Sequence, residues 1–343
     1  MEIHPKDLQQ GSERPLPLGL KPQRASALAS SHGLVLEGED LEIHELGPLS
    51  RLSRPGREVM LTYLMSTRFA EELSGVEGAV VISTSELAEH IPKGNTLLLT
   101  DQNPEVVFYD IHTLNVERGH YDTLKGYVSE SARVESSAVV APNVFVDDGA
   151  FIGYGTVVLA NTYVGKGVVL KPNATIGGDG FEIKTIRGKR SIVTHAGGVW
   201  LSEGVELGSG TCVDRGLFGD FTYLGPFAKL SNMIQVGHAG SIGKASGLAS
   251  CSQVNATIED GVWMAPNVSL NPRVTVGSHG LVGTGSVVTR DLPPHALAYG
   301  SPAKVHGWVC ECRTKLTFRH GKATCTACNS RYVEDAGDKI RRM

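Results

Sequence analysis

Four of the six cysteines in this 343-residue chain lie close together near its C-terminus. They form two short-spaced pairs, Cys310 with Cys312 and Cys325 with Cys328. Two such pairs supply four thiolates, the donor set of a closed tetrahedral Zn²⁺ site. A closed site leaves no position for a substrate, so we expect residues 308–343 to form a structural zinc ribbon. The alternative is that the four are scattered free thiols.

A histidine in the middle of the chain is a candidate for acid–base chemistry. His238 carries an imidazole, the side-chain group whose unperturbed pKa is closest to the neutral value that a general base requires. A lone histidine is as readily a surface or core residue, so its role depends on what positions it. The remaining cysteines, Cys212 and Cys251, lie within a regular repeat, where we expect small core residues rather than nucleophiles.

That repeat has a period of six residues. From Val128 to Ile176 every sixth residue is aliphatic, which fits neither the 3.6 period of a helix nor the alternation of a strand. A six-residue period is typical of a β-helix, in which each hexad forms one side of a coil and buries its aliphatic residue against the coils above and below. After interruptions at Gly177–Gly198 and beyond Val213 the period continues to Asp291-Leu-Pro-Pro. At about 4.8 Å between stacked strands, eight coils would make a prism roughly 35–40 Å tall.

The segments before the repeat differ from it and from each other. Residues 1–32 are polar and without periodicity, and we expect a flexible leader. Residues 33–124 alternate short apolar runs with helical patterns, which predicts a small α/β domain with a possible nucleotide site. We expect strands at 34–36, 41–43 (around a turn at 38–40), 61–64, 79–83 and 96–100, and helices at 66–73, capped by Ser66, and 85–90.

Composition narrows the function classes. With 41% hydrophobic and 20% charged residues the chain is an ordinary globular protein, and its net charge of −4 offers no basic footprint for nucleic acid. No apolar run is long enough for a transmembrane helix, and the polar start lacks the apolar core of a signal peptide. Cysteines at metal-ligand spacing fit a reducing compartment, so we expect a cytoplasmic protein.

Several motifs resemble one family of repeat enzymes. Leu61-Thr-Tyr-Leu, Ile176-Gly-Gly-Asp-Gly-Phe, Gly197-Gly-Val, Val213-Asp-Arg-Gly and Ile234-Gln-Val-Gly-His occur in this order. The chain thereby resembles the hexapeptide-repeat acyltransferases, above all the UDP-3-O-acylglucosamine N-acyltransferase family of lipid A (lipopolysaccharide) biosynthesis. The resemblance implies a left-handed parallel β-helix over 125–292 and a homotrimer with its clefts between subunits.

The same resemblance assigns roles to site residues. His238 occupies the position of the catalytic base, and a backbone N–H would stabilise the oxyanion. The loop of Asp179, Gly180 and Phe181 would lie beside the sugar and the pantetheine arm, with glycines permitting close approach. Further candidate contacts are His195, for the donor or the sugar, and Asn232, for polar groups of the substrate. The family's acidic residue seven positions before the base is here Ser231, and its second histidine aligns near Arg273.

Two aromatic residues of the α/β domain match the nucleobase site of that family. Its Phe-Leu-x-Asn-x-x-Tyr stretch, which stacks uracil between two rings, corresponds to Tyr63-Leu-Met-Ser66-Thr-Arg-Phe69. Stacking on Tyr63 and Phe69 would be possible, whereas Ser66 replaces the asparagine that reads the base, so thymine would stack as well. The alternative is that both rings pack in the core. Likewise Asp214 and Arg215 are either a corner ion pair or a substrate clamp.

After the repeat the chain departs from that family. At residues 293–307, Gly300-Ser301-Pro302-Ala303-Lys304 resembles the last loop of CoA-dependent sugar acetyltransferases, which lies near CoA. The acyl donor is therefore either acyl-CoA, which this loop favours, or a 3-hydroxyacyl carrier protein (ACP), which the repeat motifs favour.

These observations predict an N-acyltransferase that moves an acyl group from a thioester to the amine of a nucleotide-linked amino sugar. Two other classes remain open. One is a non-catalytic scaffold or sensor that binds a nucleotide sugar and contacts a partner through the zinc ribbon. The other is a metalloenzyme like γ-carbonic anhydrase, which would need three converging histidines that the repeats do not show.

Overall fold

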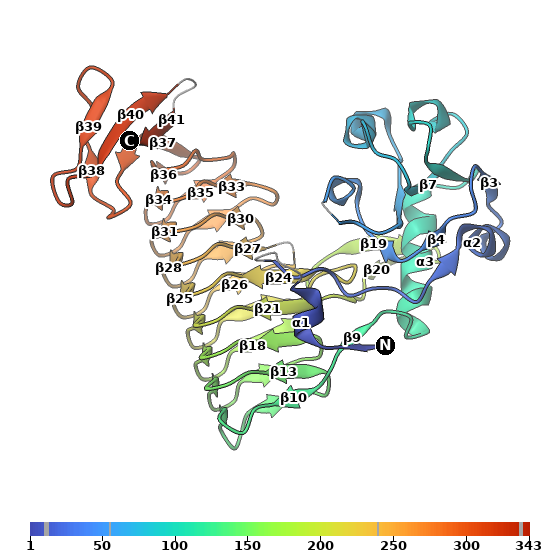
Figure 1. Ribbon diagram of the computed structural model, residues 1–343, viewed down its shortest axis with the longest axis horizontal. Coiled ribbons are helices and arrows are strands. Elements are labelled where there is room, and N and C mark those ends of the chain that lie inside the picture. Colours follow the sequence, from blue (N-terminus) through green and yellow to red (C-terminus); the bar gives the residue numbers. More distant parts are fainter. Residues whose placement is uncertain (10–13, 55, 239, 336–338) are drawn as a thin grey trace.

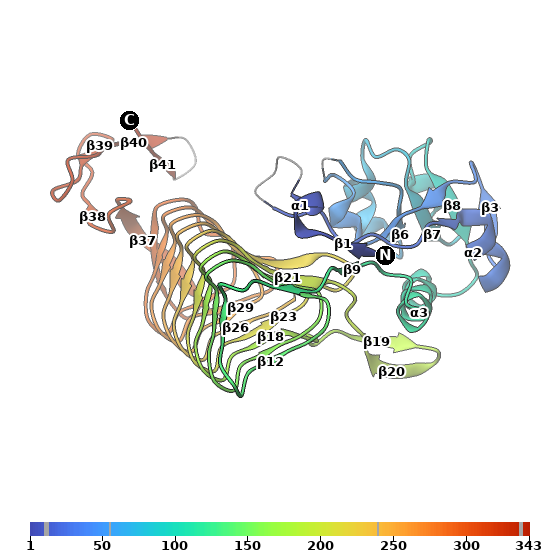
Figure 2. The same cartoon turned by 60° about the horizontal axis from the view of Figure 1, so that its bottom comes forward.

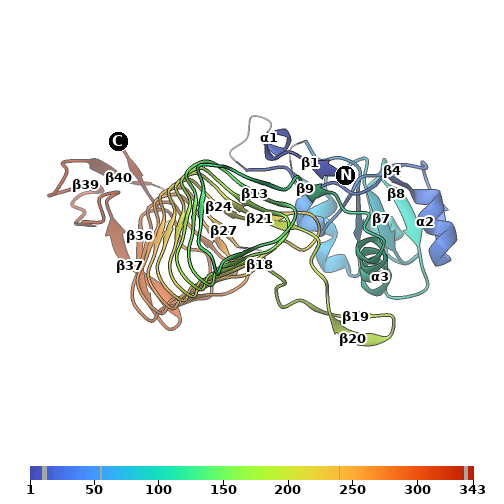
Figure 3. The ribbon, with the colours of Figure 1, turned by 90° about the horizontal axis from the view of Figure 1, so that it is seen from below.

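The computed structural model describes residues 1–9, 14–54, 56–238, 240–335 and 339–343. Its centre is a parallel β-helix of three sheets, which Figure 3 shows nearly along its axis. The first sheet contains β10 (Tyr127–Val128), β13 (Val144–Val146), β16 (Thr162–Val164), β21 (Gly198–Leu201), β24 (Phe221–Leu224), β27 (Ser241–Ile242), β30 (Thr257–Ile258) and β33 (Thr275–Val276). The second contains β11 (Arg133–Val134), β14 (Phe151–Ile152), β17 (Val169–Leu170), β22 (Glu206–Leu207), β25 (Lys229–Leu230), β28 (Gly247–Leu248), β31 (Trp263–Met264), β34 (Leu281–Val282), β36 (Ala296–Gly300), β37 (Ala303–Val309) and β38 (Lys315–Leu316). The third contains β12 (Val139–Val140), β15 (Val157–Val158), β18 (Thr175–Gly178), β23 (Cys212–Asp214), β26 (Gln235–Val236), β29 (Gln253–Val254), β32 (Ser269–Leu270) and β35 (Val287–Val288).

The hexad sets the register of these sheets. Val128 pairs with Val146 and Val158 with Ile176, so equivalent aliphatic residues stack one coil apart. From Val146 onward they form one continuous buried core. Val128 remains 47% exposed because no coil lies beneath it. The predicted α/β domain followed by a parallel β-helix is confirmed.

The α/β domain is built on a five-stranded sheet in the order β3-β8-β7-β6-β5. Its elements are α2 (Ala25–His32), β2 (Gln23–Arg24), β3 (Val35–Glu37), β4 (Glu42–Ile43), β5 (Glu45–Leu46), η1 (Leu49–Arg51), β6 (Met60–Tyr63), η2 (Thr67–Leu73), β7 (Val80–Ser83), η3 (Ala88–His90), β8 (Thr96–Leu99) and α3 (Pro104–Glu117). The Ser66 hydroxyl accepts a hydrogen bond from the Arg68 amide and caps η2, as predicted. The predicted helix at 85–90 is only the single turn η3.

The expected strands at 34–36 and 41–43 are present as β3 and β4, which pair with β8 and β2 respectively. One prediction for the N-terminal part is wrong. The expected leader is ordered where it is described: β1 (Glu2–Ile3) pairs with β9 (Thr123–Leu124), and α1 (Pro5–Leu8) follows. Its leucines Leu8 and Leu18 are buried against Trp200 and Tyr223 of the β-helix. The segment is stabilised because its leucines and these aromatic rings are removed from water together. Its polar composition alone did not predict this.

Both interruptions of the repeat leave the β-helix and contact the α/β domain (Figures 1 and 2). The first forms the hairpin β19 (Ile183–Ile186) and β20 (Lys189–Ile192) beside α3, where Lys184 bonds Glu105 and Arg187 bonds Glu117. The second carries Phe218, whose ring lies 5.3 Å from Phe108 and 4.9 Å from His112 of α3. The interruptions therefore fix the α/β domain to the side of the prism.

The chain ends beyond the last coil in a small lobe with the sheet β39 (Lys322–Thr324), β40 (Arg331–Asp335) and β41 (Lys339–Arg342). In the described part of the chain, no helix has the length and apolar character needed to cross a bilayer.

Candidate active site

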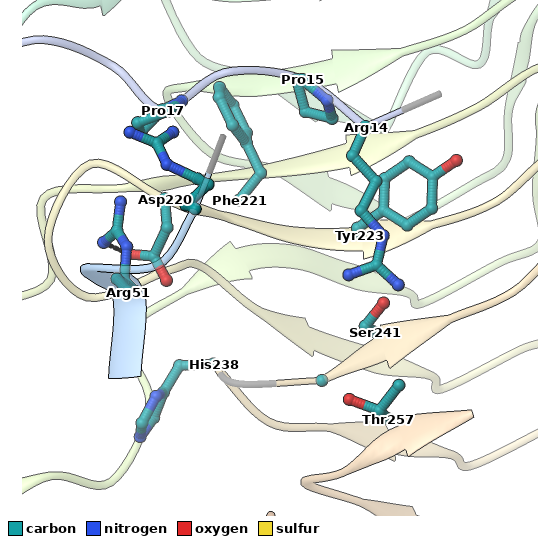
Figure 4. Close-up of a pocket in the computed structure, with 12 residues that line it drawn as sticks. Arg14, Pro15, Pro17, Arg51, Asp220, Phe221, Tyr223, His238, Ser241 and Thr257 are labelled. Carbon is teal, nitrogen blue, oxygen red and sulfur yellow. Dashed lines mark ion pairs between the residues drawn. The ribbon is translucent and has the colours of Figure 1, made fainter. Parts of the chain in front are cut away.

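His238 lies at the bend between β26 and β27, in the middle of the β-helix. Its side chain is 16% exposed and lines a cavity of about 220 Å³ (Figure 4). The other walls come from the N-terminal segment at Arg14–Pro17, the region of Arg51 and Arg54, and strands β24, β27 and β30. A histidine at the edge of a polar cavity can meet both substrate and water, which a core histidine cannot.

Gly180 brings the first interruption directly against this histidine. A Cβ atom at Gly180 would lie 2.7 Å from Cδ2 of His238 and 3.0 Å from Nε2 of His195. The two imidazole rings are themselves 5.0 Å apart at an interplanar angle of 69°. Only glycine allows the backbone to pass so close, so Gly180, His195 and His238 lie side by side.

His195 is held in one tautomer. Its Nδ1 lies 2.9 Å from the Val193 carbonyl oxygen, which can only accept, so Nδ1 carries the proton. Nε2 is then an acceptor, buried and without a hydrogen-bond partner among the described residues. Burial lowers the pKa of His195, which keeps the ring neutral. The site thus offers an unsatisfied acceptor next to His238.

An acidic residue that the sequence did not single out faces His238. Oε2 of Glu182 lies 3.8 Å from Nε2 of His238, and Oε1 of Glu182 lies 3.2 Å from Nζ of Lys184. Lys184 in turn bonds Glu105 at 2.8 Å, and the Tyr63 hydroxyl donates to Glu105 at 3.1 Å. Burial acts to lower the pKa of Lys184, but its bonds to Glu105 and the negative charges around it outweigh burial and raise it. This ionic chain connects the histidine with the α/β domain.

The position of the family's acidic residue lies elsewhere. Ser231 and Asn232 are at the bend between β25 and β26, a different corner of the coil from His238. The Ser231 hydroxyl bonds that of Ser250 at 2.9 Å, and the Asn232 amide oxygen accepts the Ser209 amide at 2.9 Å. Within one chain, therefore, Asn232 stabilises a different bend of the coil and does not lie beside His238.

The charged residues after β23 separate into two different contacts. Arg215 bonds the Gly177 carbonyl at 2.7 Å and pairs with Asp179 at 3.3 Å, so it holds the start of the first interruption. Asp214 instead accepts a hydrogen bond from Gln235 at 2.8 Å, and burial raises its pKa. The two residues do not form the ion pair considered from the sequence. Phe181, next in the loop, is 77% exposed.

Tyr63 and Phe69 lie in different apolar clusters of the α/β domain. Tyr63 packs with α3, its ring 4.9 Å from that of Phe108, whereas Phe69 packs on the cluster around Leu64 and Leu73. Burial and the negative charge of Glu105 raise the pKa of Tyr63 far above its usual value, so its hydroxyl stays protonated. The structure does not bring the two rings face to face in this chain.

The loop Gly300-Ser301-Pro302-Ala303-Lys304 joins β36 and β37 at the C-terminal end of the β-helix (Figure 1). Gly300 and Ala303 pair across the turn, and most of the loop is exposed. It lies several coils from the bend that carries His238, so a donor that touched both would need an extended arm.

The four C-terminal cysteines converge as predicted. The Sγ atoms of Cys310, Cys312, Cys325 and Cys328 all lie within 4.8 Å of one another, with Cys310 and Cys328 at 3.4 Å and Cys312 and Cys325 at 3.5 Å. Four sulfurs bound to Zn²⁺ at about 2.3 Å would stand about 3.8 Å apart. The donor set and its spacing therefore fit a tetrahedral metal site. Cys212 and Cys251 lie in the β-helix, outside this cluster, but they are not the core residues expected from the repeat, because Cys212 is only half-buried and Cys251 is exposed.

No family model matches the chain. A dTDP-3-amino-3,6-dideoxy-alpha-D-galactopyranose 3-N-acetyltransferase of Aneurinibacillus thermoaerophilus is 53% identical over 57 residues, which cover 17% of this chain and 29% of that protein. A UDP-3-O-acylglucosamine N-acyltransferase of Nitrobacter winogradskyi is 26% identical over 224 residues, covering 55% of this chain and 64% of that protein. The chain thus spans less than two thirds of either relative. A UDP-N-acetylglucosamine acyltransferase structure from Bacteroides fragilis aligns with 53% of this chain and 74% of its own at 19% identity and a TM-score of 0.38. Over part of its length the chain is therefore similar in sequence to sugar N-acetyltransferases and N-acyltransferases.

Proposed function

We propose that this protein is an N-acyltransferase that transfers an acyl group from a thioester to the amine of a nucleotide-linked amino sugar. The observation that carries the proposal is the position of His238, at the edge of a polar cavity with Gly180 against its ring and Glu182 at 3.8 Å. The names of the sequence relatives, an amino-sugar 3-N-acetyltransferase and an acylglucosamine N-acyltransferase, support the same reaction class.

In this mechanism His238 is the general base. It takes a proton from the amine as the amine nitrogen attacks the thioester carbonyl carbon. The tetrahedral intermediate then collapses with cleavage of the C–S bond, and the imidazolium returns its proton to the leaving thiolate. Glu182 stabilises the imidazolium between these two steps, since an opposite charge within 4–6 Å favours the charged form. His195, held neutral, accepts a hydrogen bond from the substrate through Nε2.

The acyl donor is proposed to be acyl-CoA, with 3-hydroxyacyl-ACP as the alternative. The exposed loop from Gly300 to Lys304 matches the CoA-dependent sugar acetyltransferases and would bind the donor. Nucleotide binding is assigned to the α/β domain, where Tyr63 and Phe69 could contribute only if a second subunit or a ligand brings them to one base. We propose the homotrimer of the family as the active form, and light scattering should then give three times the 36.5 kDa chain.

The C-terminal cysteine cluster is proposed to hold one Zn²⁺ through Cys310, Cys312, Cys325 and Cys328. Four thiolates would close its coordination shell, so the ion would stabilise the lobe and take no part in acyl transfer.

The test is a thiol-release assay with acetyl-CoA against a panel of UDP- and dTDP-linked amino sugars. Turnover with one or more amino sugars, and none with the corresponding hydroxyl sugars, is expected. Saturable binding of a nucleotide sugar without release of thiol from acetyl-CoA or acyl-ACP would instead identify a non-catalytic sensor.

A further inference from the structure

The cavity beside His238 is lined by three arginines from two separate segments. Arg14 lies on the N-terminal segment, and Arg51 and Arg54 follow β5. Figure 4 shows Arg51 beside Asp220 at one side, Arg14 beside Tyr223 and Ser241 at the other, and His238 at the lower edge. No part of the hexad or of the quoted motifs accounts for these arginines.

Two of these arginines have a carboxylate neighbour, but the two pairs differ in geometry. Arg54 is neutralised by Glu45, whose carboxylate oxygens lie 2.6 and 2.7 Å from Nη2. Asp220 is the one carboxylate among the lining residues, and its Oδ1 lies 3.5 Å from Nη1 of Arg51, longer than a hydrogen bond. Arg51 is only 17% exposed, and burying a guanidinium with an imperfect partner is costly. An anion in the cavity would offset that cost.

A buried hydroxyl in the same wall also lacks a partner. Ser241 is 8% exposed and lines the cavity, yet its Oγ has no hydrogen-bond partner in the described part of the chain. Thr257, on the next coil, lines the cavity below it. Unsatisfied buried hydroxyls are uncommon, and a donor aimed into a cavity calls for an acceptor on a ligand. Guanidinium groups on two sides with hydroxyl donors between them match an acceptor that carries several oxygens.

From this geometry we infer that the cavity binds the diphosphate group of a substrate, with Arg51, Arg14 and Ser241 as its donors. The inference rests on the proposed function, because it places the diphosphate next to the base that acts on the same substrate. Both co-substrates contain this chemistry: a nucleotide sugar carries its diphosphate beside the sugar, and CoA carries one at the end of its pantetheine arm.

The inference is tested by titration calorimetry on the full-length protein with four probes: UDP, uridine, CoA and pantetheine. UDP should bind at least tenfold more tightly than uridine, or CoA at least tenfold more tightly than pantetheine. Arg51→Gln should remove that difference in affinity, and Ser241→Ala should weaken binding of the tighter probe several-fold. Asp220→Asn keeps the oxygen that accepts the Phe218 amide and should strengthen binding of that probe. Arg319→Gln, an exposed arginine of the C-terminal lobe, is the charge-matched control.

The two pairs of probes identify which co-substrate supplies the diphosphate. Loss of affinity for UDP alone in the cavity variants assigns the cavity to the nucleotide sugar, and loss of affinity for CoA alone assigns it to the donor. Unchanged affinities for UDP and CoA in all three cavity variants would overturn the inference. That result leaves acyl transfer by the wild-type protein untouched. Conversely, a diphosphate bound through Arg51 in a protein without transfer activity would refute the proposed function alone.

Discussion

Nε2 of His238 lies 3.8 Å from Oε2 of Glu182, although His238 is at a bend of the regular coil and Glu182 belongs to the first interruption of the repeat. The carboxylate stands where an imidazolium formed during catalysis would be stabilised, and Ser231, at the position of the family's acidic residue, is at another corner. The first interruption of the repeat thus supplies the charge that the regular coil lacks.

Replacing Glu182 by Gln should lower kcat about tenfold, equivalent to about 1.4 kcal/mol on the barrier. The reason is that the imidazolium formed during transfer loses its anionic neighbour. Steady-state kinetics at saturating substrates measure kcat, and Glu182→Asp should restore part of the rate. Glu206→Gln, which breaks an exposed ion pair with Lys229, is the control. An unchanged kcat in Glu182→Gln would remove this residue from the mechanism.

Neighbouring glycines offer a matched pair of variants. In Gly180→Ala the new methyl would meet His238 at 2.7 Å and His195 at 3.0 Å, whereas at Gly178 nothing lies within 4 Å of a Cβ. Gly180→Ala should therefore reduce kcat on the order of 10- to 100-fold through displacement of the base. Gly178→Ala should keep near-normal kcat. Equal kinetics of the two variants would show that the approach of this loop to His238 is not needed.

Metal analysis tests the C-terminal cluster. The wild-type protein should contain one zinc per chain, and Cys325→Ser should lose it because only three thiolates remain. The control is Cys251→Ser, an exposed cysteine outside the cluster, which should keep full metal content. If Cys325→Ser bound zinc as tightly as the wild type, the four cysteines would not be its ligands.

A buried histidine couples the α/β domain to the β-helix in a pH-dependent way. Nε2 of His112 donates to the Thr194 carbonyl at 2.9 Å, so Nδ1 accepts from the Tyr121 hydroxyl at 2.8 Å, and burial lowers the pKa of His112 to about 4. Between pH 6.5 and 4 the unfolded chain binds a proton that the folded chain does not, so stability falls as the pH falls through this range. The loss is about 3 kcal/mol.

Urea unfolding between pH 7 and 4 measures this loss. His112→Gln should be less stable at pH 7 but should show a flatter decline toward pH 4. If both proteins declined with the same slope, titration of His112 would not limit the stability of this interface.

The regular part of the fold was predictable because a single inward residue per hexad determines the register. Helix α3 was not predicted, although Asn103 and Pro104 at its start are the usual cap and first-turn residues. The ordered structure of the N-terminal segment was not predicted. Its few leucines are buried by aromatic residues of the β-helix that are distant in sequence.

The site was predictable where motif and geometry coincide. Gly180, His195 and His238 meet, whereas Asn232 remains at another corner and Tyr63 and Phe69 in separate clusters. Glu182 and Arg51 were missed because both lie outside the periodic segments, where distance along the sequence says nothing of distance in space.

If His238 is the general base, its removal abolishes proton transfer from the amine, and turnover of His238→Ala at saturating donor and amino sugar measures that loss. Loss of a general base should lower kcat by roughly 10²- to 10⁴-fold. His90→Ala, in the turn η3 of the α/β domain, should behave as wild type. A His238→Ala protein that folds and retains near-normal kcat would show that His238 is not the base.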